Sequence, residues 1–132
     1  MTQAQKKKEL QIMTEDKPGM LAEVTSLVSG AGVNIEAMCA YGGMQGKGTF
    51  LLITSDNAKI KQAAAQKGWN VEEHDVVVTT VSDTAGTASE VANKVKVKNI
   101  NLLYSYVTCS NNTCKIVLRA ENSDALAAAV GK

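Results

Sequence analysis

The sequence predicts an α+β fold in which two similar β-α-β-β-α-β units follow one another, each with an antiparallel sheet and helices on one face of it. Three observations lead to this prediction. Apolar residues alternate between the spacing of strands and that of amphipathic helices, in the order strand, helix, strand, strand, helix, strand. The same order begins again further along the chain. The composition is 45% hydrophobic, as in a chain that forms a packed core.

The first unit is expected over residues 9–75, after a polar tail at residues 1–8. Its first helix has apolar residues at the 3.6-residue period from Met20 to Ala31. Gly32 follows at the position where a left-handed residue often ends a helix. We expect strands at residues 9–13, 33–41, 49–54 and 69–81, and helices at residues 20–31 and 56–67.

The turn into the first helix is the most informative stretch of the sequence. Asp16 stands where a side chain would cap the helix, and Pro18 and Gly19 form the tight turn that starts it. The backbone N–H groups at such a helix start, together with the helix dipole, favour an anion such as a carboxylate. The same residues are also expected of a well-capped turn that binds nothing.

The second unit is expected over residues 76–132 because the turn motif recurs there. Asp83 occupies the position in the repeat that corresponds to Asp16, at an offset of 67 residues (83 − 16). Asn101 corresponds to Asn34 at the same offset. This unit ends after its second helix without an evident fourth strand. Either the last extended stretch of the first unit therefore serves both units, or another chain covers the open sheet edge.

Charge and hydropathy argue against two classes of partner. The 14 basic and 13 acidic residues nearly cancel, which argues against a protein that binds nucleic acid by neutralising phosphates. No stretch approaches the roughly 18 apolar residues of a membrane span, and the start of the chain has no apolar signal-peptide core. We therefore expect a cytoplasmic protein with neither nucleic acid nor membrane as a partner.

Cysteine and histidine are too few for a structural zinc site. The chain has one histidine, His74, and three cysteines, Cys39, Cys109 and Cys114, of which no two form a C-x-x-C pair. Cys109 and Cys114 flank a hairpin loop and can face each other across two strands, although reduced, packed thiols are the expected state. No nucleophile lies in an arrangement with a base that the sequence supports, so no catalytic residue, metal or cofactor is expected.

A free amino acid carries a carboxylate and an ammonium group, and the turn region offers partners for both. The N–H groups at residues 17–21 suit the carboxylate. Asn34, at the start of the next strand, both donates and accepts hydrogen bonds, so it suits either group. We expect these two places to lie at the same end of the β-α-β unit. Alternatively, Asn34 is only a turn residue that tolerates a left-handed backbone.

Two motifs resemble the ACT domain family: DKPGML at residues 16–21, and GVNI at residues 32–35 after one helix. Members of that family are small ferredoxin-like regulatory modules that bind amino acids or similar metabolites. The resemblance is close over residues 9–75 and weaker over residues 76–132, where Ala85 stands in place of the proline.

In that family the ligand usually lies between two modules, where it contacts the first strand-to-helix turn of one and the start of the second strand of the other. The resemblance therefore implies a set of ligand-binding residues in each unit. In the first unit these are Asp16, Pro18, Gly19, Met20, Leu21, Asn34 and Ile35. In the second unit these are Asp83, Gly86, Thr87, Asn101 and Leu102.

The resemblance implies a regulatory sensor that binds a small molecule, namely an amino acid, and catalyses no reaction. The ligand would shift the population between arrangements of the modules, and a homodimer is the expected assembly. The alternative is a structural or oligomerisation module that pairs with a partner protein and binds no small ligand. An enzyme is the third hypothesis, which a measurable turnover would support.

Overall fold

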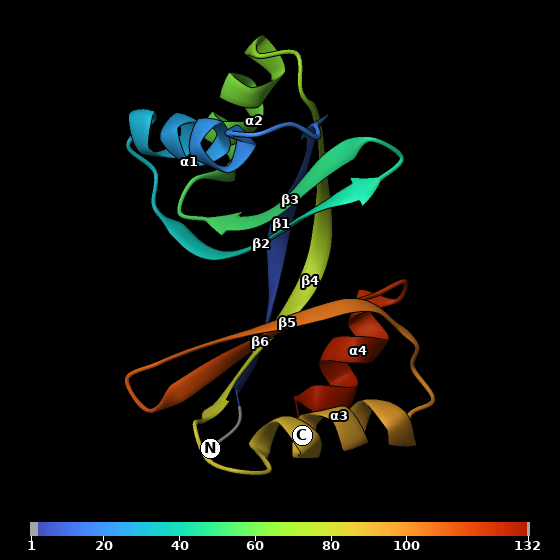
Figure 1. Cartoon of the computed structure of the whole chain (residues 1–132). Coiled ribbons are helices and arrows are strands. Elements are labelled where there is room, and N and C mark those ends of the chain that lie inside the picture. The colour runs from blue at the N-terminus through green and yellow to red at the C-terminus, as the bar shows by residue number, and fades with distance from the viewer. Residues whose placement is uncertain (1–2, 132) are drawn as a thin grey trace. The chain divides into compact units, whose positions relative to one another are not determined.

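The computed structural model describes residues 3–131 and contains four helices and six strands in that range (Figure 1). None of these helices has the length and the hydrophobicity that crossing a membrane requires. The strands are β1 (Gln3–Glu15), β2 (Ile35–Met44), β3 (Lys47–Thr54), β4 (Asn70–Ser82), β5 (Leu102–Ser110) and β6 (Thr113–Ala120). The helices are α1 (Met20–Gly30), α2 (Asn57–Gln66), α3 (Thr87–Val97) and α4 (Ser123–Val130).

The strands follow the order β2-β3-β1-β4-β6-β5, and the chain divides into two compact units. The first unit comprises residues 8–74, and the second unit comprises residues 3–7 together with residues 75–131. β1 and β4 are each 13 residues long and contribute to both units. Each unit is therefore a ferredoxin-like fold with four strands and two helices, and the chain is a tandem of two such folds.

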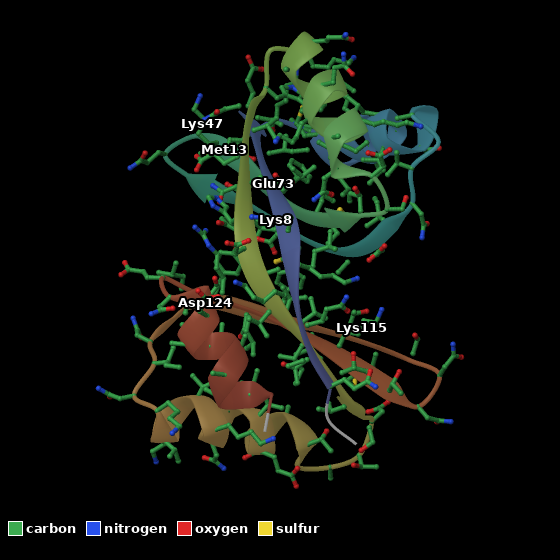
Figure 2. The ribbon with its side chains drawn as sticks, turned by 180° about the vertical axis from the view of Figure 1, so that it is seen from behind. Lys8, Met13, Lys47, Glu73, Lys115 and Asp124 are labelled. Atoms are coloured by element: carbon green, nitrogen blue, oxygen red, sulfur yellow. A yellow bond between two sulfur atoms is a disulfide. The ribbon has the colours of Figure 1, made fainter. Side chains whose placement is uncertain are left out.

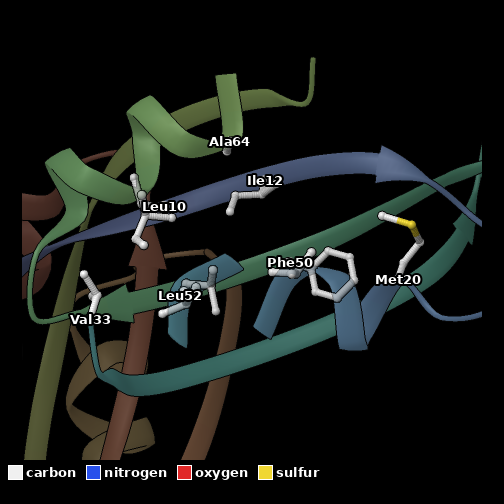
Figure 3. Close-up of a cluster of buried hydrophobic side chains, with 10 residues drawn as sticks. Leu10, Ile12, Met20, Val33, Phe50, Leu52 and Ala64 are labelled. Carbon is white, nitrogen blue, oxygen red and sulfur yellow. The ribbon is translucent and has the colours of Figure 1, made fainter. Parts of the chain in front are cut away.

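The core of the first unit lies between one face of its sheet and the helices α1 and α2 (Figure 3). β1 pairs antiparallel with β3 in a register that places Ile12 opposite Phe50, and β3 pairs antiparallel with β2. Leu10 and Ile12 are fully buried together with Val24 of α1 and Ile60 of α2. Each such side chain contributes roughly 1.5–3 kcal/mol on burial, and this burial holds the helices on the sheet.

The second unit repeats this arrangement with its own core. β4 pairs antiparallel with β6, so that Val77 lies opposite Leu118, and β6 pairs antiparallel with β5. Val77 and Leu118 pack with Val91 of α3 and Leu126 of α4 in a second hydrophobic cluster. Ala4 of β1 packs against the same cluster. The repeat in the sequence thus corresponds to two cores of the same design.

Residues 3–7 were expected in a polar tail, and the structure instead places them in β1 as part of the second unit. There they take the position of a fourth strand beside β4. The Nζ of Lys6 donates a hydrogen bond to Asp124 Oδ1 at the start of α4, which raises the pKa of Lys6 above its usual value of 10.5. The run of lysines predicted a solvent-exposed tail. The strand is formed by pairing with a segment distant in the sequence, and such pairing leaves no local pattern in these residues. Residues 1 and 2 of the expected tail lie outside the described residues.

Two glycines delimit α1. Gly32 has a φ of +72° just past the end of the helix, as the sequence predicted. Gly19 is the N-cap residue with a φ of +89°, and no side chain makes a capping hydrogen bond there. The prediction that Asp16 caps α1 was wrong, because its carboxylate accepts a hydrogen bond from the backbone N–H of Gly43 (2.9 Å) instead.

Ala4→Asp should destabilise the second unit by about 1–3 kcal/mol, because it would place a carboxylate against the hydrophobic cluster of that unit. Gln5→Asp is the matched control, since Gln5 is exposed on the same strand, and it should cost about 0.5 kcal/mol or less. Urea denaturation followed by circular dichroism measures both free energies. Equal costs for the two variants would contradict the assignment of residues 3–7 to the folded second unit.

Gly19→Ala should destabilise the protein by about 1–2 kcal/mol, because an L residue is strained at a φ of +89° even though no atom lies within 4 Å of the added Cβ. Gly30→Ala lies in the same helix with equally open space and no left-handed φ, so it should stabilise by about 0.5–1 kcal/mol. Thermal denaturation of the two variants gives the sign of each change. A loss of stability of the same size in both would refute the special backbone requirement at Gly19.

Candidate functional site

The first unit contains a cavity of about 510 Å³ at the end where β1 meets α1. A volume of this size lies within the range of roughly 300–1,000 Å³ that is common for small-molecule sites. Four segments line the cavity: the end of β1, the first turn of α1 with the residue Lys17 before it, the start of β3, and the connection from α2 to β4. The lining residues are Met13, Thr14, Glu15, Lys17, Met20, Glu23, Lys47, Lys67, Gly68, Trp69 and Asn70.

The cavity has a buried floor and a charged rim. Thr14 and Met20 are buried, at 3% and 6% exposure. Lysine and glutamate side chains that are exposed to solvent form the rim, and the Nζ of Lys17 lies 3.6 Å from Oε2 of Glu15. Lys47 joins this rim from the start of β3, and Figure 2 shows it beside Met13 at this end of the unit. Groups of both charges therefore surround one small cavity.

The start of α1 adds backbone donors at the same place. The N-cap Gly19 has no side chain to accept hydrogen bonds from the first turn, and its carbonyl accepts one from the N–H of Glu23 (3.0 Å). The earlier N–H groups of the helix have no partner within the helix, because a helix leaves its first donors unpaired. These donors and the positive end of the helix dipole favour an anion near Lys17 and Met20.

Asp16 connects the turn to the hairpin between β2 and β3. Its carboxylate accepts from Gly43 N–H (2.9 Å), and its own N–H donates to the carbonyl of Gly46 (3.3 Å). A Cβ at Gly42 would lie 2.7 Å from the Asp16 carboxylate, so only glycine fits there without a shift. Asp16 is not among the residues that line the cavity, and in this structure it positions the turn.

Asn34 and Ile35 lie at the opposite end of the first unit from the turn. Ile35 pairs with Thr54 at one end of β3, whereas Glu15 pairs with Lys47 at the other. These β3 residues are seven positions apart (54 − 47), or about 23 Å at about 3.3 Å per residue. The expectation that the turn before α1 and Asn34 lie at the same end of the first unit was wrong. Both β1 and β2 run antiparallel to β3, so α1 must carry the chain back along the sheet before β2 begins.

The turn of the second unit repeats the geometry of the first. Gly86 is the N-cap of α3 with a φ of +93°, and no side chain makes a capping hydrogen bond there. The N–H of Asp83 donates to the carbonyl of Asn112 in the hairpin between β5 and β6 (2.9 Å). The hydroxyl of Thr87 donates to the carbonyl of Ser82 (2.8 Å), which fixes the turn from the helix side.

Asn101 and Leu102 line a different cavity, of about 450 Å³, at the end of α3. Leu102 pairs with Ala120 at one end of β6, and Ser82, next to Asp83, pairs with Thr113 at the other. The predicted residues of the second unit therefore form two separate groups, as in the first unit. The other residues that line this cavity are Ala92, Val95, Lys96, Asn99 and Ile100.

Of the seven residues predicted in the first unit, Met20 lines the cavity at the turn, and the other six do not. Sequence reasoning missed Glu15, Glu23 and Lys47. The helical spacing could have predicted Glu23, because it lies three residues after Met20 on the same face of the helix. The segment at residues 67–70 carries no such signal, since only the folding of α2 onto the sheet brings it to the cavity.

Cys109 and Cys114 form a disulfide across the hairpin between β5 and β6, while Cys39 is free. The expectation of reduced thiols at this pair was wrong. The two residues are directly opposite in the ladder between β5 and β6, so their side chains point to the same face of the sheet.

Several solved structures are similar to this chain. A protein from Bacteroides thetaiotaomicron has a TM-score of 0.86 and 27% identity, over 96% of this chain and 87% of that chain. The ligand-free regulatory subunit of aspartate kinase from Thermus thermophilus has a TM-score of 0.71 and 12% identity, over 96% and 93% of the two chains. The corresponding regulatory subunit from Thermus flavus has a TM-score of 0.63 and 16% identity, over 97% and 94%. At identities this low, the likeness to the aspartate kinase subunits shows the fold.

Comparison of sequences places the chain in a family. No curated protein sequence matches it. The family model described as an ACT domain pair matches residues 5–130, which span both ferredoxin-like units and all four helices. The repeated turn, the repeated core and this match agree, and the chain belongs to the ACT domain pair family.

Proposed function

We propose that this ACT domain pair is a regulatory protein that binds an amino acid, and that the cavity beside the start of α1 is its binding site. The observation that carries the proposal is the combination of an uncapped helix start with lysine and glutamate side chains around one cavity. An amino acid is a zwitterion, and a site for it needs partners of both charges within a few ångströms of each other.

The ligand carboxylate would lie toward the N–H groups at the start of α1, with Lys17 and Lys47 as charged partners. The ammonium group would lie toward the carboxylates of Glu15 and Glu23 on the same rim. Met20 offers an apolar contact at the floor of the cavity for the ligand side chain. The proposal assigns no reaction to these residues.

The second part of the proposal concerns the predicted residues that do not line this cavity. We propose that they act between modules, as the family implies, with Asp16, Pro18, Gly19 and Leu21 on one side and Asn34 and Ile35 of another module on the other. Within one unit these groups are about 23 Å apart along β3, so a module other than their own, for example in a homodimer, would have to supply Asn34. The recurrence of the turn at Asp83, Gly86 and Thr87 supports a second such site.

Regulation would follow from a difference in ligand affinity between two states of the protein. A ligand that binds one state more tightly shifts the population toward that state, and a partner that contacts the favoured state reads the change. Membership of the ACT domain pair family supports a regulatory role of this kind.

The alternative is pairing with a partner protein without any small ligand, and one observation favours it. β5 is the last strand in the sheet order, and its residues Leu103 and Val107 are 48% and 52% exposed. Apolar residues on an exposed edge strand suit the addition of a strand from another chain.

A thermal-shift screen against the twenty amino acids tests the proposed class of ligand. A ligand that binds only the folded protein should stabilise it by about 2.7 kcal/mol at about 100 times its dissociation constant, which raises the melting temperature by several degrees. One clear upward shift, reproduced by calorimetry with a defined stoichiometry, supports the sensor. A flat panel on a protein that melts cooperatively contradicts amino-acid binding and favours the partner protein.

The site is tested with the amino acid that the screen identifies. Lys47→Met should weaken its binding about tenfold, or by about 1.4 kcal/mol, because the carboxylate loses one charged partner. Lys59→Met is the matched control, since Lys59 is exposed on α2 in the same unit and does not line the cavity. Isothermal titration calorimetry measures both constants, and equal affinities in the two variants would place the site elsewhere.

A further inference from the structure

The Cys109–Cys114 disulfide closes the tip of the hairpin between β5 and β6. The two cysteines are separated by five positions and are direct partners in the ladder. Between them, Asn111 and Asn112 have φ values of +52° and +64°, the left-handed conformation of a tight hairpin turn. The two residues differ in exposure, since Cys109 is exposed and Cys114 is buried at 7% exposure.

The disulfide lies where this hairpin meets the turn between β4 and α3. The N–H of Asp83 in that turn donates to the carbonyl of Asn112 in the hairpin (2.9 Å). A carboxylate oxygen of Asp83 and the two sulfurs all lie within 4.8 Å of one another. The covalent link, the carboxylate and the hydrogen bond thus occupy one small contact between two segments of the second unit.

The first unit has the same contact without a disulfide. Thr14 pairs with Gly48 in the first unit where Val81 pairs with Cys114 in the second, so Gly48 stands in place of the buried cysteine. The strand opposite Gly48 has a register shift between Tyr41 and Met44. There the Asp16 carboxylate, the counterpart of Asp83, accepts a hydrogen bond from the hairpin N–H of Gly43 (2.9 Å). The two units therefore hold equivalent hairpins by different means, and one of those means is sensitive to reductants.

We propose that Cys109 and Cys114 form a reversible redox site that exchanges with small thiols of the glutathione class, and that its oxidation state sets how firmly the hairpin holds the β4–α3 turn. This inference stands apart from amino-acid binding, since it needs no ligand. It assigns the point of attack to the sulfur of Cys109, because that residue is exposed to solution and Cys114 is buried.

The thiol–disulfide exchange proceeds in two steps. A small thiolate attacks the sulfur of Cys109, a mixed disulfide forms at Cys109, and Cys114 leaves as a thiolate that takes a proton from water. A second small thiolate attacks the small-molecule sulfur of the mixed disulfide and releases Cys109 as a thiolate, which is protonated in turn. The protein disulfide gains two electrons and two protons, and two small thiols become one small disulfide.

Reduction should loosen the contact for a physical reason. It removes the covalent link across the hairpin, and any thiolate that forms at either cysteine is repelled by the nearby Asp83 carboxylate. The hydrogen bond from Asp83 to Asn112 then depends on the hairpin backbone and on the hydrogen bond that the Thr113 hydroxyl donates to the Ser110 carbonyl (3.0 Å). In the first unit nothing changes, because its cysteine, Cys39, forms no disulfide.

The position of attack is tested in a Cys39→Ser background, which removes the free thiol. With Cys114→Ser added, oxidised glutathione should form an adduct at Cys109, seen by mass spectrometry. With Cys109→Ser added instead, adduct formation at Cys114 should be at least about tenfold slower because that sulfur is buried. Equal rates would overturn the assignment of Cys109. Failure of the Cys39→Ser protein to form the disulfide in any glutathione buffer would overturn the redox site itself.

The effect on the turn is measured by amide hydrogen exchange of the Cys39→Ser protein in oxidised and reduced glutathione. Exchange at the Asp83 amide should become at least about tenfold faster on reduction. The Asp16 amide, which donates to Gly46 in the first unit, is the internal control and should not change. The Cys109→Ser/Cys114→Ser variant should exchange fast at Asp83 in both buffers. Unchanged exchange at Asp83, or an equal rise at both aspartates, would overturn the proposal.

Discussion

The fold depends on two long strands that carry residues of both units. A four-stranded ferredoxin-like sheet without its fourth strand leaves the backbone groups of the first strand exposed at an open edge. In the first unit residues 70–74 of β4 supply that strand, and in the second unit residues 3–7 of β1 supply it. Units of this size bury little surface, so neither has a margin of stability that would tolerate a missing strand.

The contact between the helix-starting turn and the neighbouring hairpin recurs in both units and positions the turn. In the first unit the Asp16 carboxylate bonds to the hairpin backbone, and this requires glycine at position 42. In the second unit the backbone of Asp83 bonds to the hairpin, and a disulfide closes the hairpin beside its carboxylate. The same contact is thus held in one unit by a carboxylate hydrogen bond and in the other beside a disulfide, which a reductant can cleave.

The cavity in the first unit shows how a fold of this kind concentrates charge without burying it. Glu15 ends β1, Lys17 lies in the turn and Glu23 lies in the first turn of α1. Lys47 begins β3. Because these side chains are exposed, folding does not remove their charges from water. The left-handed Gly19 leaves the helix donors without a side-chain cap, so an anion can satisfy them.

The sequence by itself determined the repeated order of strands and helices and the glycine after α1, since these follow from local periodicity and backbone preference. Only the tertiary structure decided that residues 3–7 form a strand, that Asp16 bonds to a hairpin, and that Asn34 lies far from the turn. The tertiary structure also decided that residues 67–70 line the cavity and that Cys109 pairs with Cys114. Each of these features depends on which distant segments of the sequence become neighbours. Strand pairing and helix packing decide those neighbours, and no local sequence pattern encodes such contacts.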